Sequence, residues 1–106
     1  MVLLRLLKHP YIVGYKDFWQ EDFHVFIVME FCKGGDVGAM IDKGVSIPEK
    51  RVMIWICQIA MALHHMHKNN VLHRDIKPQN LFLNQWSDIK IGIVSIIYLL
   101  FFEGPT

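Results

Sequence analysis

The segment His73-Arg74-Asp75-Ile76-Lys77-Pro78-Gln79-Asn80 decides how this chain is interpreted. It follows a long helical pattern and the apolar pair Val71-Leu72, and it runs directly into the apolar triplet Leu81–Leu83. Taken singly, Asp75 or Asn80 could simply bond backbone amides at the end of a loop. A whole segment in this register, between a buried helix and a strand, makes that alternative a poor account.

The spacing Asp75-x-Lys77-x-x-Asn80 brings three chemical groups into one short loop. Phosphoryl transfer needs a carboxylate to orient the attacking hydroxyl, cations on the phosphates and oxygen ligands for Mg²⁺. Asp75 can accept the hydroxyl proton, and Lys77, two positions on in an extended loop, can neutralise charge on the transferred phosphate. The amide oxygen of Asn80 is a hard ligand suited to Mg²⁺. These three residues are therefore the predicted catalytic residues.

The apolar and polar patterns predict an α+β chain. Helices are expected over Val2–Lys8, Val37–Lys43 and Ile47–Lys68, and strands over Ile12–Trp19, Phe23–Phe31, Leu81–Leu83 and Ile89–Ile91. Gln20-Glu21-Asp22 makes the short connection of an antiparallel hairpin, and Lys33–Asp36 breaks its second strand.

The longest predicted helix carries its own start signal and one apolar face. Ser46 and Glu49 have the spacing of a capping box, and Pro48 stands in the first turn. Apolar side chains recur at helical spacing and predict a buried face made of Val52, Trp55, Ile56, Ile59, Leu63 and Met66.

Composition excludes several classes of protein. A net charge of +1 without runs of like charge gives no footprint for nucleic acid. Cys32 and Cys57 show no CxxC spacing, which favours two reduced thiols in a cytosolic protein over a disulfide. His64 and His67 share a helix face but have no Glu or Cys beside them, which favours ordinary helix residues over a zinc site.

The chain resembles the middle of a eukaryotic protein kinase domain, most closely that of the NIMA-related Ser/Thr kinases. The resemblance is carried by HPYIV at 9–13, IVMEFCKGGD at 27–36 and the stretch 63–80 that ends in HRDIKPQN. It covers residues 1–92 and implies a partial kinase fold: the end of helix αC and two small-lobe strands (1–31), the hinge (32–36), and helices αD and αE, the catalytic loop and a short hairpin of the large lobe (37–92). Arg74, Lys77 and HPYIV argue against a small-molecule phosphotransferase of the kinase-like type.

The resemblance implies an ATP site with Mg²⁺ and a protein substrate. Met29 would be the gatekeeper, and the backbones of Glu30 and Cys32 would bond the adenine edge. Asp36 would lie near the ribose, and Phe82 would form the floor of the adenine pocket. From chemistry alone, Met29 and Phe82 are core residues, which is compatible with lining a pocket. The family implies a cytoplasmic protein, with nuclear or cytoskeletal association as options.

The chain also departs from the family. The Gly-rich loop, the strand lysine and the αC glutamate would precede Met1, and Ile93-Val94-Ser95 stands where the family continues with Asp-Phe-Gly after Gly92. An isoleucine cannot coordinate a hard cation. We therefore expect a truncated or mis-spliced form that is inactive alone. The alternative is a non-catalytic, pseudokinase-like binding module or dominant-negative fragment.

The last residues, 93–106, are expected to form an apolar tail outside the family pattern. The apolar run 91–102, rich in β-branched and aromatic residues, matches an aggregation-prone segment and is too short to span a bilayer.

Overall fold

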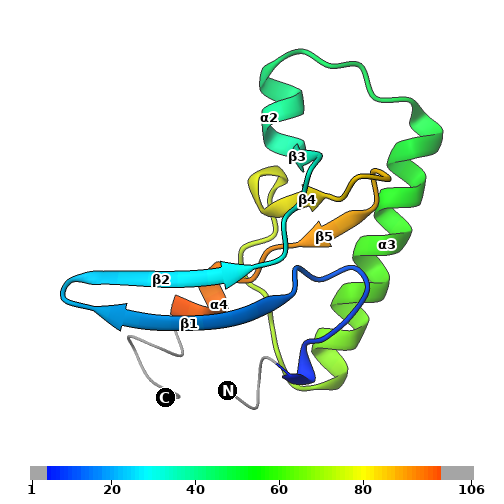
Figure 1. Cartoon of the computed structure of the whole chain (residues 1–106). Coiled ribbons are helices and arrows are strands. Elements are labelled where there is room, and N and C mark those ends of the chain that lie inside the picture. Colours follow the sequence, from blue (N-terminus) through cyan, green and yellow to red (C-terminus); the bar gives the residue numbers. More distant parts are fainter. Residues whose placement is uncertain (1–4, 99–106) are drawn as a thin grey trace.

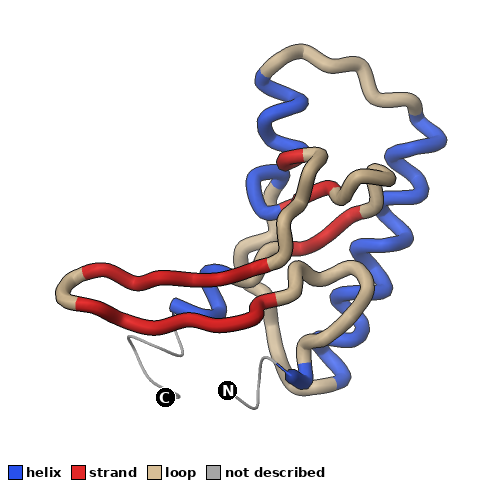
Figure 2. Tube along the Cα trace, viewed as in Figure 1, coloured by secondary structure: helices blue, strands red, loops and turns tan. Residues whose placement is uncertain are grey.

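The computed structural model describes residues 5–98, in which a small antiparallel sheet lies beside one long helix and a two-stranded hairpin extends away from it (Figure 1). The elements in chain order are β1 Tyr15–Glu21, β2 His24–Met29, β3 Gly35–Asp36, α2 Val37–Asp42, α3 Glu49–Lys68, a 3₁₀ turn Pro78–Asn80, β4 Leu81–Leu83, β5 Ile89–Ile91 and α4 Val94–Tyr98. Figure 2 shows the β1–β2 hairpin projecting away from the helical part. The predicted partial kinase fold of the α+β class is confirmed, and the chain contains both the hairpin and the long helix that the sequence predicts.

The two sheets are joined through the loop before β1. Strands β1 and β2 form a two-stranded sheet, and β3, β4 and β5 form a second sheet in that order. Ile12 bridges Ile91 in parallel, with the Val13 amide donating to the Ile91 carbonyl at 2.9 Å and the Ile91 amide donating to the Tyr11 carbonyl at 2.8 Å. The predicted strand from Ile12 therefore starts three residues late at Tyr15, because its first residues pair with β5 instead of β2.

The other strand boundaries differ from prediction where the chain turns away from its partner. β2 ends at Met29, so Phe31 lies outside the strand and is 85% exposed. Gly35 and Asp36, predicted only to break that strand, form the short strand β3 against Leu83 and Phe82.

Helix α3 packs on β5 by a narrower face than predicted. Its buried residues are Trp55, Gln58, Ala62 and Met66, whereas the predicted Val52 and Ile56 are exposed. The predicted capping box is wrong, because Pro48 is the N-cap residue and no side chain caps the helix. The sheet covers only one side of α3, so the remaining apolar residues face outward.

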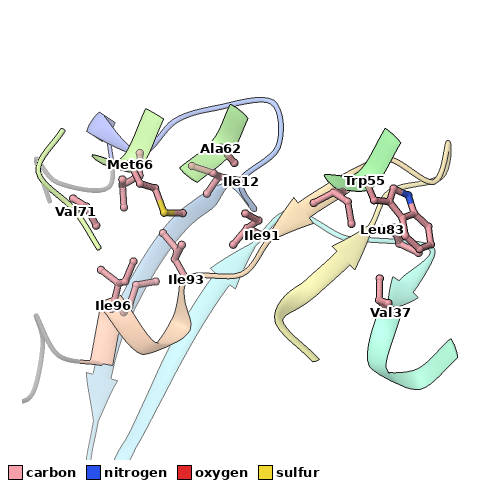
Figure 3. Packing of buried hydrophobic residues seen from close by; sticks show 13 residues of the cluster. Ile12, Val37, Trp55, Ala62, Met66, Val71, Leu83, Ile91, Ile93 and Ile96 are labelled. Atoms are coloured by element: carbon pink, nitrogen blue, oxygen red, sulfur yellow. The ribbon is translucent and has the colours of Figure 1, made fainter. Parts of the chain in front are cut away.

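One hydrophobic core runs from α3 through the strands to α4. Its members are Leu7, Ile12, Val37, Trp55, Ala62, Met66, Val71, Leu83, Ile89, Ile91, Ile93, Ile96 and Ile97. Figure 3 shows Ile93 and Met66 pointing into one end of this core, with Trp55 and Val37 at the other end.

The segment after Gly92, for which no helix or strand is predicted, turns into the core. Residues Val94–Tyr98 form the helix α4, and Ile93, Ile96 and Ile97 are buried in the core. The β-branched side chains gain more from this burial than from an extended conformation without a partner strand. The rest of the predicted tail, 99–106, and the start of the helix predicted over Val2–Lys8 lie outside the described residues; residues 5 and 6 are helical.

No helix within residues 5–98 has the length and apolar character needed to cross a membrane.

Candidate active site

The three predicted catalytic residues meet in the loop between α3 and β4. The Asn80 Nδ2 atom donates to the Asp75 carbonyl at 2.8 Å and to the Asp75 Oδ2 atom at 3.1 Å. The Lys77 ammonium lies 3.7 Å from the Asp75 Oδ1 atom, and both side chains are partly exposed, at 52% and 42%. The carboxylate is therefore held from two sides while remaining accessible to a hydroxyl.

His73 fixes the backbone beneath this carboxylate. Its side chain is buried, its Nδ1 atom accepts a hydrogen bond from the Asp75 amide at 3.1 Å, and its Nε2 atom lies 2.6 Å from the Gly92 carbonyl. Because Nδ1 accepts, the ring proton is on Nε2 and is donated to Gly92. His73 is therefore a packing and hydrogen-bonding element of the loop.

The loop turns sharply at Arg74, which adopts a positive φ of 66°. This left-handed conformation is costly for a residue with a Cβ atom and persists only where surrounding contacts impose it. Two neighbouring contacts impose this conformation on Arg74. One is the hydrogen bond from the Asp75 amide to His73, and the other is the 3₁₀ turn Pro78–Asn80, which begins with a proline. The result is that Asp75 and Asn80 face each other across the loop.

The predicted hinge leaves two backbone groups available beside Met29, which is half-buried at the end of β2. The Glu30 amide donates to the Gly14 carbonyl at 2.8 Å, and the Cys32 carbonyl accepts from the Gly35 amide at 3.1 Å. Among the described residues, the Glu30 carbonyl and the Cys32 amide have no hydrogen-bond partner. One acceptor and one donor, two residues apart, therefore remain for a ligand.

The hinge side chains are held by their own contacts. The Glu30 carboxylate accepts from the Gly14 amide at 2.8 Å and pairs with the Lys90 ammonium at 3.5 Å. Burial raises the pKa of the Cys32 thiol, and the nearby Glu30 carboxylate adds to that shift. Cys32 therefore remains a thiol at neutral pH. It is half-buried and Cys57 is exposed, and both are free cysteines.

Asp36 and Phe82 are opposite each other in the β3–β4 pair, one predicted beside the ribose and the other beneath the adenine. The Asp36 carboxylate also caps α2, accepting from the Ala39 amide at 2.8 Å. Phe82 is half-buried, and a Cβ atom added at Gly92 would lie 2.7 Å from its ring. The chain thus brings hinge, phenylalanine and catalytic loop to one edge of the small sheet, although Met29, Glu30, Cys32, Asp36 and Phe82 remain predicted contacts.

The comparisons with known proteins agree with this arrangement. The sequence matches the family described as protein kinase domain over residues 1–92. The chain belongs to the protein kinase domain family. It is 46% identical over 101 residues to serine/threonine-protein kinase Nek4 of Mus musculus, covering 92% of this chain and 13% of that protein.

Two further relatives support the NIMA-related resemblance. Serine/threonine-protein kinase Nek3 of Mus musculus is 43% identical, with 86% of this chain and 18% of that protein aligned. Serine/threonine-protein kinase Nek5 of Homo sapiens is 44% identical, with 80% of this chain and 12% of that protein aligned. The predicted resemblance is confirmed, and the chain spans less than a fifth of the length of these relatives.

A protein kinase domain uses ATP with Mg²⁺. The groups of this kinase segment fit the nucleotide better than they fit the metal. The free hinge groups suit an adenine edge. Mg²⁺ prefers six oxygen ligands in octahedral geometry, carboxylates among them. Asn80 offers one amide oxygen, Asp75 is already paired with Lys77, and Ile93 is buried at the position of the family's aspartate. Within residues 5–98, no three His, Cys, Asp or Glu side chains lie together as a metal site. With one amide oxygen and one carboxylate already paired, the loop does not fit the metal.

Three residues that hold this kinase segment together were missed from the sequence. Gln58 donates to the Asp88 carboxylate at 2.9 Å and accepts from the Ile89 amide at 2.9 Å, tying α3 to the β4–β5 hairpin. The Tyr15 hydroxyl accepts from the Ile93 amide, and Lys90 pairs with Glu30. Only Gln58 gave a signal, because it is a polar residue on the apolar face that contains Trp55 and Ala62.

A cavity of about 860 Å³ lies beside Glu30 of the predicted hinge rather than at the catalytic loop. It is lined by the loop 9–13 and by β1, and reaches Glu30, Lys90 and Ile93. None of the three predicted catalytic residues lines it. The hydrogen-bond geometry of the loop therefore identifies the candidate site better than cavity size does.

Proposed function

We propose that this chain carries the catalytic loop and the adenine-binding hinge of an ATP-dependent protein serine/threonine kinase. The observation that carries the proposal is the contact of Asn80 and Lys77 with the two carboxylate oxygens of Asp75. A capped turn would bond a carboxylate to backbone amides, whereas here both partners are side chains and the carboxylate stays accessible.

In a complete kinase domain with this loop, Asp75 would accept the proton of a serine or threonine hydroxyl as that oxygen bonds the γ-phosphorus atom of ATP. The bond from that phosphorus to the β,γ-bridging oxygen would break, and ADP would leave. Asn80 orients the carboxylate through its Nδ2 atom. Its amide oxygen, the Mg²⁺ ligand predicted from the sequence, would supply only one of the oxygens that the metal needs. Lys77 carries the positive charge closest to Asp75 and offsets negative charge on the transferred phosphate. His73 is a positioning residue that fixes the Asp75 amide.

Adenine is proposed to bind at the hinge. The Glu30 carbonyl would accept from the adenine N6 amino group, and the Cys32 amide would donate to an adenine ring nitrogen. Met29 and Phe82 would contact the two sides of the ring system, and Asp36 would lie near the ribose. Guanine presents an O6 acceptor where adenine has its N6 donor. The same hinge would therefore exclude guanine nucleotides.

We propose that the chain by itself binds nucleotide without transferring phosphate. Ile93 is buried and supplies no oxygen where the family has a metal-binding aspartate. Metal ions stabilise the transferring phosphoryl group by several kcal/mol, which corresponds to orders of magnitude in rate. This observation favours the second candidate function, a pseudokinase-like module that binds the partners of a related active kinase. The two free cysteines favour a cytoplasmic location.

Two measurements on the 106-residue chain test the proposal. In a thermal shift assay, ATP and adenosine should raise the melting temperature, whereas GTP and guanosine should not. In a transfer assay with labelled ATP and a generic protein substrate, the chain should show no more transfer than Asp75→Ala. A chain whose melting temperature ATP leaves unchanged would refute nucleotide binding. Transfer that Asp75→Ala abolishes would refute the inactive form while supporting the assigned role of Asp75.

A further inference from the structure

The residues directly after β5 turn into the core instead of toward the candidate site. Ile93, Ile96 and Ile97 are at most 6% exposed, and we call them the isoleucine cluster. In Figure 3, Ile93 and Ile96 lie on the same side of the core as Met66 and Val71. Burial removes these apolar side chains from water and stabilises this position of the segment. The direction of this segment is therefore fixed by its apolar side chains.

Backbone hydrogen bonds hold the same segment on both sides. The Ile93 amide donates to the Tyr15 hydroxyl at 3.1 Å, across 78 residues of sequence. The Gly92 carbonyl accepts from His73, and the Ile93 carbonyl accepts from the Ile97 amide at 3.1 Å within α4. Burial raises the pKa of the Tyr15 hydroxyl, so this hydrogen bond is unaffected by pH in the neutral range. The segment has little freedom to swing a polar group toward Asn80.

The polar groups that directly precede Ile93 along the chain and the carboxylate of the loop are already engaged. Lys90, the β5 residue paired with Phe82, carries a positive charge and is engaged with Glu30. The Gly92 carbonyl is taken by His73. The oxygen-bearing side chains of the loop are Asp75, Gln79 and Asn80. The Asp75 carboxylate bonds both Asn80 and Lys77, and the Gln79 side chain lies against Gly38 of α2. A Mg²⁺ ion bound to phosphate would thus gain at most weak contacts from this part of the chain.

We infer that this chain binds adenine nucleotides independently of Mg²⁺, because the isoleucine cluster replaces the metal-binding segment at the end of β5. The inference rests on the proposed nucleotide binding at the hinge and names the ligand of that site: the nucleotide itself, without its metal. Binding energy comes from the hinge groups and Phe82, and the metal adds nothing to it.

The test measures the dissociation constant of a fluorescent ATP analogue for the 106-residue chain, in EDTA and in excess Mg²⁺. The two constants should agree within about threefold, a difference of less than 1 kcal/mol. Tightening by Mg²⁺ of about tenfold or more would overturn the inference and leave the proposed hinge binding standing. Absence of binding in both buffers would overturn the proposed function together with the inference.

A pair of variants tests whether Ile93 is the reason that Mg²⁺ does not tighten nucleotide binding. Ile93→Asp adds a carboxylate at the end of β5, and Val94→Asp adds one at the neighbouring exposed position as the control. In variants that keep the native circular dichroism spectrum, Ile93→Asp should bind more tightly in Mg²⁺ than in EDTA, and Val94→Asp should not. Metal-dependent tightening in Val94→Asp, or its absence in a folded Ile93→Asp, would contradict the assignment to Ile93. If Ile93→Asp fails to fold, the comparison of the two buffers on the unsubstituted chain decides alone.

Discussion

Replacing Gln58 with leucine keeps the side-chain volume in the core but removes both hydrogen bonds between α3 and the β4–β5 hairpin. The amide of the fully buried Ile89 loses the Gln58 oxygen that accepts its hydrogen bond at 2.9 Å. The half-buried Asp88 carboxylate loses the Gln58 amide group that donates to it at 2.9 Å. An unsatisfied buried amide costs about 1–3 kcal/mol, and we add about 1 kcal/mol for the partly solvated Asp88 bond. The expected loss is therefore about 3 kcal/mol.

Urea unfolding followed by tryptophan fluorescence measures this loss, since Trp55 is buried beside the hairpin and bonds the Ser87 carbonyl. The midpoint should fall with little change in the slope m, because the surface exposed on unfolding is nearly the same. Gln85→Leu, in the exposed turn of the same hairpin, is the matched control and should change stability by less than about 0.5 kcal/mol. A Gln58→Leu chain as stable as this control would refute the importance of the two bonds.

Three further predictions concern the site and its surroundings. The pKa of His9 lies below its usual 6.5, mainly because of burial and then because of His65 and Lys90, and its neutral Nδ1 atom accepts the Tyr11 amide. Stability should therefore be full above pH 6.5 and decline as the pH falls through the lowered pKa; His9→Asn should flatten this profile, and the exposed control His24→Asn should not. Gly92→Ala should cost about 1–3 kcal/mol by pushing on the Phe82 ring and should weaken the ATP-induced thermal shift, whereas Gly14→Ala, with ordinary contacts, should change neither. A double-mutant cycle of Glu30→Gln and Lys90→Met should give a coupling of about 0.5–1 kcal/mol in urea unfolding, and a coupling of zero would show that the 3.5 Å pair does not contribute.

Local patterns predicted the elements whose causes lie within a few residues. The hairpin around Gln20-Glu21-Asp22 and the helix that contains Trp55 and Met66 follow from alternation and helical spacing. The same patterns failed at Val52 and Ile56, because an apolar face is buried only where the rest of the chain covers it. They failed again at Ser46, because Pro48 takes the N-cap position in the structure.

The sequence by itself determined the chemistry of this protein, since the residue types and spacing in His73–Asn80 are enough to identify the kinase family. Only the tertiary structure decided which side chains lie where they could take part in phosphoryl transfer. The Tyr15–Ile93 and Gln58–Asp88 bonds join residues 78 and 30 positions apart, a separation that no local periodicity encodes. These contacts, with burial of the isoleucine cluster, leave the Asp75 loop intact and exclude metal ligands from the end of β5. The physical reason is that side-chain burial, which depends on the whole fold, sets the direction of Ile93.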